Sequence, residues 1–231
     1  MAFTERVHAF IAARFHTRLT EAFGERGRKA FVHGTQYYAE QRGRRMAQRA
    51  IRDGQPLTPA TYYRYGEWVN TEEVKALGCA NRMEYQTYQP EAVLHITQCP
   101  WYTQFKEMGL NTSAGAEYCR HLDNSIVRGF NPYLTYEVDQ TLQTATHCIH
   151  RMKNVDFDGQ TNLAKKPENL RSFEYHCAHS YWAYAEVVTA IFGQAGQSLC
   201  DAVLAEFEAD YGTDMAQILR SYENVNFNIC G

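Results

Sequence analysis

Glycine and proline are scarce in this chain of 231 residues, which contains 15 Gly and 6 Pro. This composition excludes collagen-like and low-complexity chains and favours an ordinary globular fold. The chain also lacks an uninterrupted apolar run long enough for a membrane-spanning helix. Its N-terminus carries charges and no long apolar segment, so it does not have the pattern of a signal peptide. We therefore expect a cytoplasmic protein with reduced thiols.

Basic charge is not in excess either. The chain has 23 Lys and Arg against 26 Asp and Glu, which gives a net charge of −3. This balance provides no overall attraction to nucleic acid or to a membrane, and neither is expected as a partner. The motifs GxGxxG, GxxxxGKS/T and GxSxG are also missing. Nucleotide-dependent and serine-hydrolase chemistry therefore have no support, and no cofactor is expected.

Cysteine and tyrosine are abundant by contrast, with 7 Cys and 16 Tyr. The odd number of cysteines leaves at least one thiol free in any full pairing, and no CxxC motif occurs. Reduced cysteines are apolar fillers, metal ligands or reactive groups. Composition alone does not choose among these three.

Hydrophobic spacing predicts helices, a hairpin, further helices, a second hairpin and a helical end. Apolar residues recur at three- and four-residue steps in 2–23, and Gly24 ends that helix. The other expected elements are helices at 25–51, 101–109 and 113–127 and hairpins at 82–99 and 133–153. The pattern predicts an α+β fold with a small antiparallel sheet of about four strands. We expect a single domain over 1–231, with N-terminal helices 2–70, a hairpin-helix-hairpin core 82–153 and C-terminal helices 167–225.

The central third of the chain holds the side chains best suited to chemistry. Cys119 and Asp123 are four residues apart on a predicted helix and therefore share one face. Cys148 and His150 are two apart on a predicted strand, so they point to one face of the sheet. Cys99 ends another strand, just before a proline. A buried Asp123 needs a partner, whereas each cysteine taken alone is more often an apolar filler.

Three further features have both a structural and a functional interpretation. The HCAH segment at 176–179 has the spacing of a metal-binding histidine pair, or of two histidines that hydrogen-bond their neighbours. The helix at 25–51 is strongly basic and includes Arg45, so it is either a solvated face or an anion-binding surface. Tyr65 and Trp68 either pack in the core or stack on a flat heterocycle.

Several stretches occur in an order that is typical of one family. They are RGRRMAQRAIRDG at 42–54, YYRYGEW at 62–68, a strand that ends in Cys99-Pro100, YCRHLDNSIVRGFNP at 118–132, and Cys148. This ordered set resembles the L-2-amino-thiazoline-4-carboxylic acid hydrolases. The resemblance implies an enzyme that opens 2-amino-thiazoline-4-carboxylate, or a related cyclic amidine, by adding water at the carbon between the heteroatoms. It points to Cys99, Cys119, Asp123, Asn131 and Cys148 as site residues.

The chemistry of such a ring suggests a role for each group. The ring carbon is more electrophilic when the amidine is protonated, so we expect Asp123 to pair with the amidine and to shuttle a proton. Cys119 would attack this carbon as a thiolate and form a covalent intermediate that water resolves. A thiolate needs a nearby cation, for which His150 and His121 are candidates. Basic side chains of the segment 42–49, Arg45 in particular, would hold the substrate carboxylate.

The candidate site therefore consists of two groups of residues. The predicted catalytic group is Cys119, Asp123, Cys148, Cys99 and His150, and the predicted substrate-binding group is Asn131, Arg45, Tyr65, Trp68 and His121. Two alternatives remain open. The three thiols and Asp123 bind a zinc ion that activates water, or the pocket binds a small molecule without catalysis. The partner is a small molecule in every case, and the helical flanks leave a homo-oligomer open.

Overall fold

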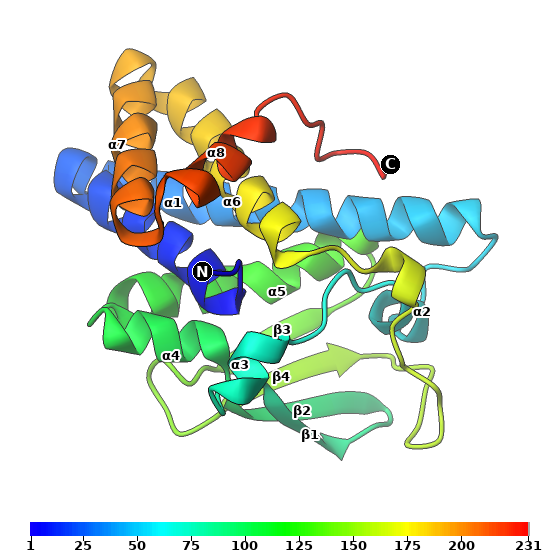
Figure 1. Ribbon diagram of the computed structural model, residues 1–231. Coiled ribbons are helices and arrows are strands. Elements are labelled where there is room, and N and C mark those ends of the chain that lie inside the picture. Colours follow the sequence, from blue (N-terminus) through cyan, green and yellow to red (C-terminus); the bar gives the residue numbers. More distant parts are fainter. Residues whose placement is uncertain (231) are drawn as a thin grey trace.

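Helices cover one side of a small antiparallel sheet in this protein (Figure 1). The computed structural model describes residues 1–230. Its helices are α1 (Glu5–Arg52), α2 (Pro59–Arg64), α3 (Glu72–Ala76), α4 (Pro100–Glu107), α5 (Ala116–Phe130), α6 (Phe173–Phe192), α7 (Gln194–Tyr211) and α8 (Thr213–Ser221). Its strands are β1 (Arg82–Thr87), β2 (Glu91–Gln98), β3 (Tyr136–Gln140) and β4 (Cys148–Lys153). The predicted α+β class is confirmed. Among the described helices, none combines the length and the apolar character needed to cross a membrane.

Helix α1 bends at Gly24, where φ is positive at 55°. The predicted end of a helix at this glycine is confirmed, although the chain re-enters a helix without a loop. The same bend occurs at Gly193 (φ 59°) between α6 and α7. Phe23 and Phe192, which precede the two glycines, stack with their ring centroids 3.8 Å apart. The bend in α1 folds its first arm back along its second arm.

The sheet has the strand order β1-β2-β4-β3, and every neighbouring pair is antiparallel. Both predicted hairpins are present, and pairing between β2 and β4 joins them. In this register Leu94 lies opposite His150 and Ile96 lies opposite Cys148. Because alternate residues of a strand point to opposite faces, these four side chains share one face. That face lies under the helices in Figure 1, so the register decides which strand residues meet them.

Two helix boundaries differ from the sequence prediction. Helix α5 starts at Ala116 rather than at 113, because Asn111–Gly115 forms a π-helical turn before it. The helix expected from 167 onward starts only at Phe173, after a short 3₁₀ turn. Ser172 caps this helix by accepting a hydrogen bond from the backbone of the third residue along.

Helices α1 and α5 cross with their backbones in contact. A β-carbon on Gly43 would lie 2.1 Å from the carbonyl oxygen of Ile126, and one on Gly129 would lie 2.4 Å from that of Glu40. Only glycine fits at both positions without moving the helices apart. This crossing fixes the second arm of α1 against α5, and both helices contribute side chains to the candidate site.

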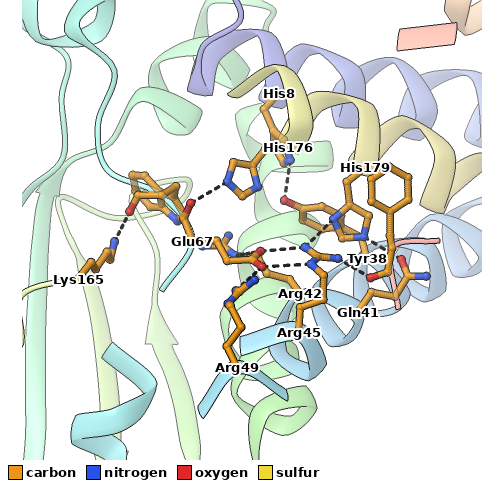
Figure 2. Close-up of polar contacts among 12 residues, drawn as sticks. His8, Tyr38, Gln41, Arg42, Arg45, Arg49, Glu67, Lys165, His176 and His179 are labelled. Atoms are coloured by element: carbon orange, nitrogen blue, oxygen red, sulfur yellow. Dashed lines mark hydrogen bonds and ion pairs between the residues drawn. The ribbon is translucent and has the colours of Figure 1, made fainter. Parts of the chain in front are cut away.

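A fully buried carboxylate, that of Glu67, ties the segment after α2 to α1 (Figure 2). It accepts hydrogen bonds from Nε and Nη2 of Arg45 at 3.1 and 2.8 Å and from Nη2 of Arg49 at 2.5 Å. Nε of Arg42 lies 3.8 Å from it. Burial alone raises the pKa of Glu67, but the charges and hydrogen bonds of the arginines lower it to about 2. We call these four residues the Glu67 cluster; three guanidinium groups face one carboxylate in it.

The HCAH segment packs on the Glu67 cluster. His176 Nε2 donates to the carbonyl oxygen of Glu67 at 3.2 Å, and His179 Nδ1 accepts from Arg45 Nη2 at 3.3 Å. Burial lowers the pKa of His176 to about 3, so this ring is neutral at pH 7. Arg45 also donates to the carbonyl oxygen of Phe227. The cluster therefore joins α1, the segment after α2, α6 and the C-terminal segment.

Replacing Glu67 by glutamine should destabilise the fold, because three guanidinium groups lose their countercharge. Breaking a buried ion pair from one side costs about 3–5 kcal/mol, and urea denaturation at pH 7 measures the loss. The matched control is Glu206→Gln, which removes a partner of Arg14 and Arg18 nearer the surface. It should cost less than about 1 kcal/mol. Equal losses in the two variants would contradict the importance of the cluster.

The pH dependence of stability provides a second readout of the same carboxylate. Since the pKa of Glu67 is lowered from 4.5 to about 2, its contribution is fully present above pH 4.5. That contribution is lost as the pH falls from 4.5 toward 2. We expect the Glu67→Gln variant to lack this part of the acid-induced loss of stability.

Candidate active site

A cavity of about 340 Å³ lies between the sheet and the helices α1 and α5. All four strands contribute to its floor, and the two crossing helices contribute to its roof. Side chains from the segment after α2 and from the loop after β4 close it further. Much of the lining is apolar or aromatic. Its polar lining includes two groups of side chains. The acidic and thiol-bearing group contains Asp123 and three cysteines, and the basic group consists of Arg42 and Lys165.

The acidic and thiol-bearing group contains every member of the predicted catalytic group. Cys119 and Asp123 extend from successive turns of α5, as their spacing predicted. Cys148 and His150 extend from the inner face of β4, and Cys99 lies at the N-cap of α4. The fold thus brings five side chains from three separate elements to one cavity.

The three thiols of the cavity are protonated at neutral pH. Burial raises the pKa of Cys99 to about 12, that of Cys148 to about 11 and that of Cys119 well above its ordinary value. Each sulfur faces an N–H group, which lowers the pKa of the thiol, but burial raises that pKa by more. Gln143 Nε2 donates to Cys119 Sγ at 3.3 Å, and the backbone N–H of Leu142 donates to Cys148 Sγ at 3.2 Å. Backbone N–H groups at the start of α4 face Cys99.

No histidine supplies the cation that the predicted thiolate needs. Burial lowers the pKa of His150 in spite of the opposing charge of Asp123, so its ring is neutral at pH 7. His150 Nδ1 lies 2.8 Å from Tyr136 Oη, with which it is hydrogen-bonded, and 4.0 Å from an oxygen of Asp123. His121 does not line the cavity, and burial lowers its pKa as well. The expected activation of Cys119 by a histidine cation has no support in the free protein.

Arg42 and Lys165 form the basic group, and both lie against the ring of Trp68. Arg42 Cζ is 6.0 Å and Lys165 Nζ is 4.6 Å from the ring centroid. Burial, together with the charge of Arg42, lowers the pKa of Lys165 to about 8. Within residues 1–230, Nε of Arg42 is buried without a hydrogen-bond partner, and its contact with Glu67 is too long for one. The basic group can therefore accept an anion.

The predicted role of Arg45 needs a correction. Both of its interactions with Glu67 are hydrogen bonds inside the Glu67 cluster, and it does not line the cavity. Arg42, almost one helical turn earlier, faces the cavity instead. The predicted basic segment thus lines the cavity through Arg42, whereas Arg45 is held by the carboxylate of Glu67, which lies after the next helix.

Three other predicted substrate-binding residues also lie outside the cavity lining. Tyr65 Oη donates to Asp53 Oδ2 at 2.8 Å, and Asn131 Nδ2 donates to the carbonyl oxygen of Leu57 at 2.8 Å. These bonds hold loops in place. His121 is the third, as described above. Of the predicted substrate-binding group, Trp68 alone lines the cavity, and its ring orders the two cations.

The sequence analysis did not identify several residues of the cavity wall. His8 and Tyr38 lie in the periodic stretches of α1, where they have the spacing of ordinary core residues. Lys165 lies in a polar loop without any motif. The sequence did contain one signal for Tyr38. Tyr38 and Arg42 are four residues apart in α1, so their side chains must share one face of that helix.

The described residues provide no set of ligands for the predicted zinc alternative. Among residues 1–230, no three His, Cys, Asp or Glu side chains come together closely enough to hold a metal ion. The three thiols and Asp123 line one cavity without converging on one point.

A model of the L-2-amino-thiazoline-4-carboxylic acid hydrolase family matches residues 4–151, almost two thirds of the chain. The chain belongs to this family. The hydrolase family match runs from the start of α1 to β4, so it includes the crossing helices and the whole sheet. Leu163 and Lys165 are the lining residues of the cavity that lie beyond it. No curated protein and no solved structure matches the chain.

Anion binding in this cavity should weaken as the pH rises through about 8. Lys165 is a cation below its pKa of about 8 and neutral above it, so the dissociation constant of an anion increases with pH. Titration calorimetry with thiazolidine-4-carboxylate between pH 7 and pH 9.5 measures this change. Lys165→Met should give weaker binding with a flat profile over this range. An unchanged pH dependence in that variant would show that another group is responsible.

Proposed function

We propose that this protein opens 2-amino-thiazoline-4-carboxylate, or a closely related carboxylate-bearing cyclic amidine, by hydrolysis. The observation that carries the proposal is the guanidinium of Arg42, whose buried Nε has no hydrogen-bond partner among residues 1–230, in one cavity with Cys119 and Asp123. The cavity thus offers a cation for a carboxylate, a carboxylate for an amidine and a thiol for the carbon between nitrogen and sulfur. The family name describes a substrate with these features.

The Glu67 cluster explains why the cavity attracts an anion. Arg45 and Arg49 occupy both oxygens of Glu67, which leaves Arg42 without a hydrogen-bonding acceptor there. A buried charge without a partner is costly. A substrate carboxylate would satisfy Arg42 with charge-assisted hydrogen bonds, which are stronger than neutral ones. Lys165, on the same tryptophan ring, adds a second positive charge.

The substrate itself supplies the charge that activates the thiol. Asp123 is the one acidic side chain among the described lining residues, and an amidine is a base that pairs well with a carboxylate. Once bound and protonated, the amidine places a positive charge beside Cys119. A nearby cation lowers the pKa of a thiol. The thiol therefore becomes reactive in the complex and stays protected in the free protein.

The reaction proceeds in two displacement steps at one carbon. Cys119 gives its proton to Asp123, and its sulfur bonds to the ring carbon between nitrogen and sulfur. The bond from that carbon to the ring sulfur then breaks, and Asp123 protonates the departing sulfur. Water next adds to the carbon of the enzyme-bound isothiourea while Asp123 takes one of its protons. The bond to Cys119 then breaks, and Asp123 returns that proton to the departing Cys119 sulfur. One water is consumed, and the product is N-carbamoyl-cysteine with a free thiol.

Cys119→Ser should eliminate the covalent intermediate, and Asp123→Asn should lower kcat by about 10²–10⁴-fold. Release of the product thiol measures turnover, and mass spectrometry of acid-quenched protein detects the adduct. Cys230→Ser, which removes a cysteine outside the cavity lining, is the control and should retain turnover. Full turnover by Cys119→Ser would exclude Cys119 as nucleophile. Binding without turnover by the unmodified protein would favour the non-catalytic alternative.

Arg42→Met should raise KM by about 10- to 100-fold, the range expected for loss of a hydrogen bond to a charged group. It should not lower stability, because the group removed has no hydrogen-bond partner at Nε among the described residues. Arg44→Met, at an exposed position of the same helix, is the matched control and should leave KM unchanged. Steady-state kinetics and urea denaturation provide the two readouts. A lower stability with an unchanged KM would assign Arg42 a structural role only.

A further inference from the structure

Tyr38 lines the cavity from the turn of α1 that precedes Arg42. Tyr38 is 1% exposed, and the residue that hydrogen-bonds its oxygen is His8, whose Nε2 lies 3.0 Å away. Figure 2 shows this hydroxyl directed at His8. Either group can be the donor in such a pair. The direction of this bond therefore decides what Tyr38 offers to a bound molecule.

Trp101 decides that direction. Its indole Nε1–H can only donate, and it lies 3.0 Å from His8 Nδ1. His8 Nδ1 must therefore be an acceptor without a proton. The hydroxyl of Tyr118, at 3.4 Å, is a second donor toward the same nitrogen. Burial lowers the pKa of His8 well below its ordinary value, so the ring is neutral and carries its proton on Nε2.

It follows that His8 Nε2–H donates to Tyr38 Oη, and the hydroxyl hydrogen of Tyr38 remains free. No acceptor for this hydrogen occurs among the hydrogen bonds of residues 1–230, and both Tyr38 and His8 line the cavity. Arg42 has donors only. Tyr38 and Arg42 therefore form a pair of donors on one face of α1, because they are four residues apart.

We propose that Tyr38 is a specificity-determining residue that donates its hydroxyl hydrogen to the substrate carboxylate beside Arg42. A wall of donors accepts a group that carries only acceptors, such as a carboxylate, and rejects a carboxamide, whose NH₂ would face other donors. The choice of a ring acid as ligand rests on the proposed function. The preference for an acid can nevertheless be measured as binding, without turnover.

Titration calorimetry with thiazolidine-4-carboxylate and with its carboxamide tests this subsite. Tyr38→Phe should weaken binding of the acid by about 10-fold or more, as expected for a lost hydrogen bond to a charged group. Binding of the carboxamide should change less than twofold. Tyr184→Phe is the matched control, because its buried hydroxyl bonds to Thr35 away from the cavity lining and its loss should leave both affinities unchanged. An unchanged acid affinity in Tyr38→Phe would overturn the proposal.

The tautomer of His8 is a second, independent test. The ¹⁵N NMR shifts of the unmodified protein should show a protonated Nε2 and an unprotonated Nδ1 on His8 at pH 7. A proton on Nδ1 would make Tyr38 the donor to His8 and would overturn the proposal.

The two proposals fail in different ways. If hydrolysis occurs but the preference for the acid survives in Tyr38→Phe, the function stands and the role of Tyr38 is wrong. If the unmodified protein turns over no thiazoline but loses its acid preference in Tyr38→Phe, the subsite stands and the proposed reaction is wrong.

Discussion

The buried carboxylate of Glu67 is the interaction on which the rest of the structure depends. It lies among three arginines of α1, and its neighbours bring α6 and the C-terminal segment to the same place. Its two oxygens are taken by Arg45 and Arg49, so the third guanidinium, that of Arg42, is left over at the cavity wall. A structural ion cluster with more guanidinium groups than carboxylates is thus the basis of the proposed anion site.

The cavity combines this surplus cation with thiols and histidines that are uncharged in the free protein. Burial keeps the three thiols protonated and the cavity histidines His8 and His150 neutral. An amidine-bearing substrate would bring the missing positive charge to Asp123 and Cys119, while its carboxylate would complete the partners of Arg42. In the proposed complex the charges of protein and substrate are complementary at both ends, so the reactive thiol would form only there.

The spacing of residues along the chain was sufficient to predict part of the candidate site. A spacing of four residues places Cys119 and Asp123 on one helix face, and the helix breaks and both hairpins follow from glycine positions and alternation. Periodicity could not show that β2 pairs with β4, which brings distant thiols to one cavity. It also could not choose between Arg42 and Arg45, because that choice depends on where Glu67 packs. Where Glu67 packs depends on contacts between residues far apart in the chain, and no local pattern encodes them.

The orientation of the bound ring tests the central claim most directly. A crystal structure of the Asp123→Asn variant with 2-amino-thiazoline-4-carboxylate would show it. We expect the carboxylate within hydrogen-bonding distance of Arg42 and of Tyr38 Oη. The amidine should face residue 123, with the carbon between nitrogen and sulfur next to Cys119 Sγ. A ring bound with its carboxylate toward the thiols, or bound outside this cavity, would contradict the account.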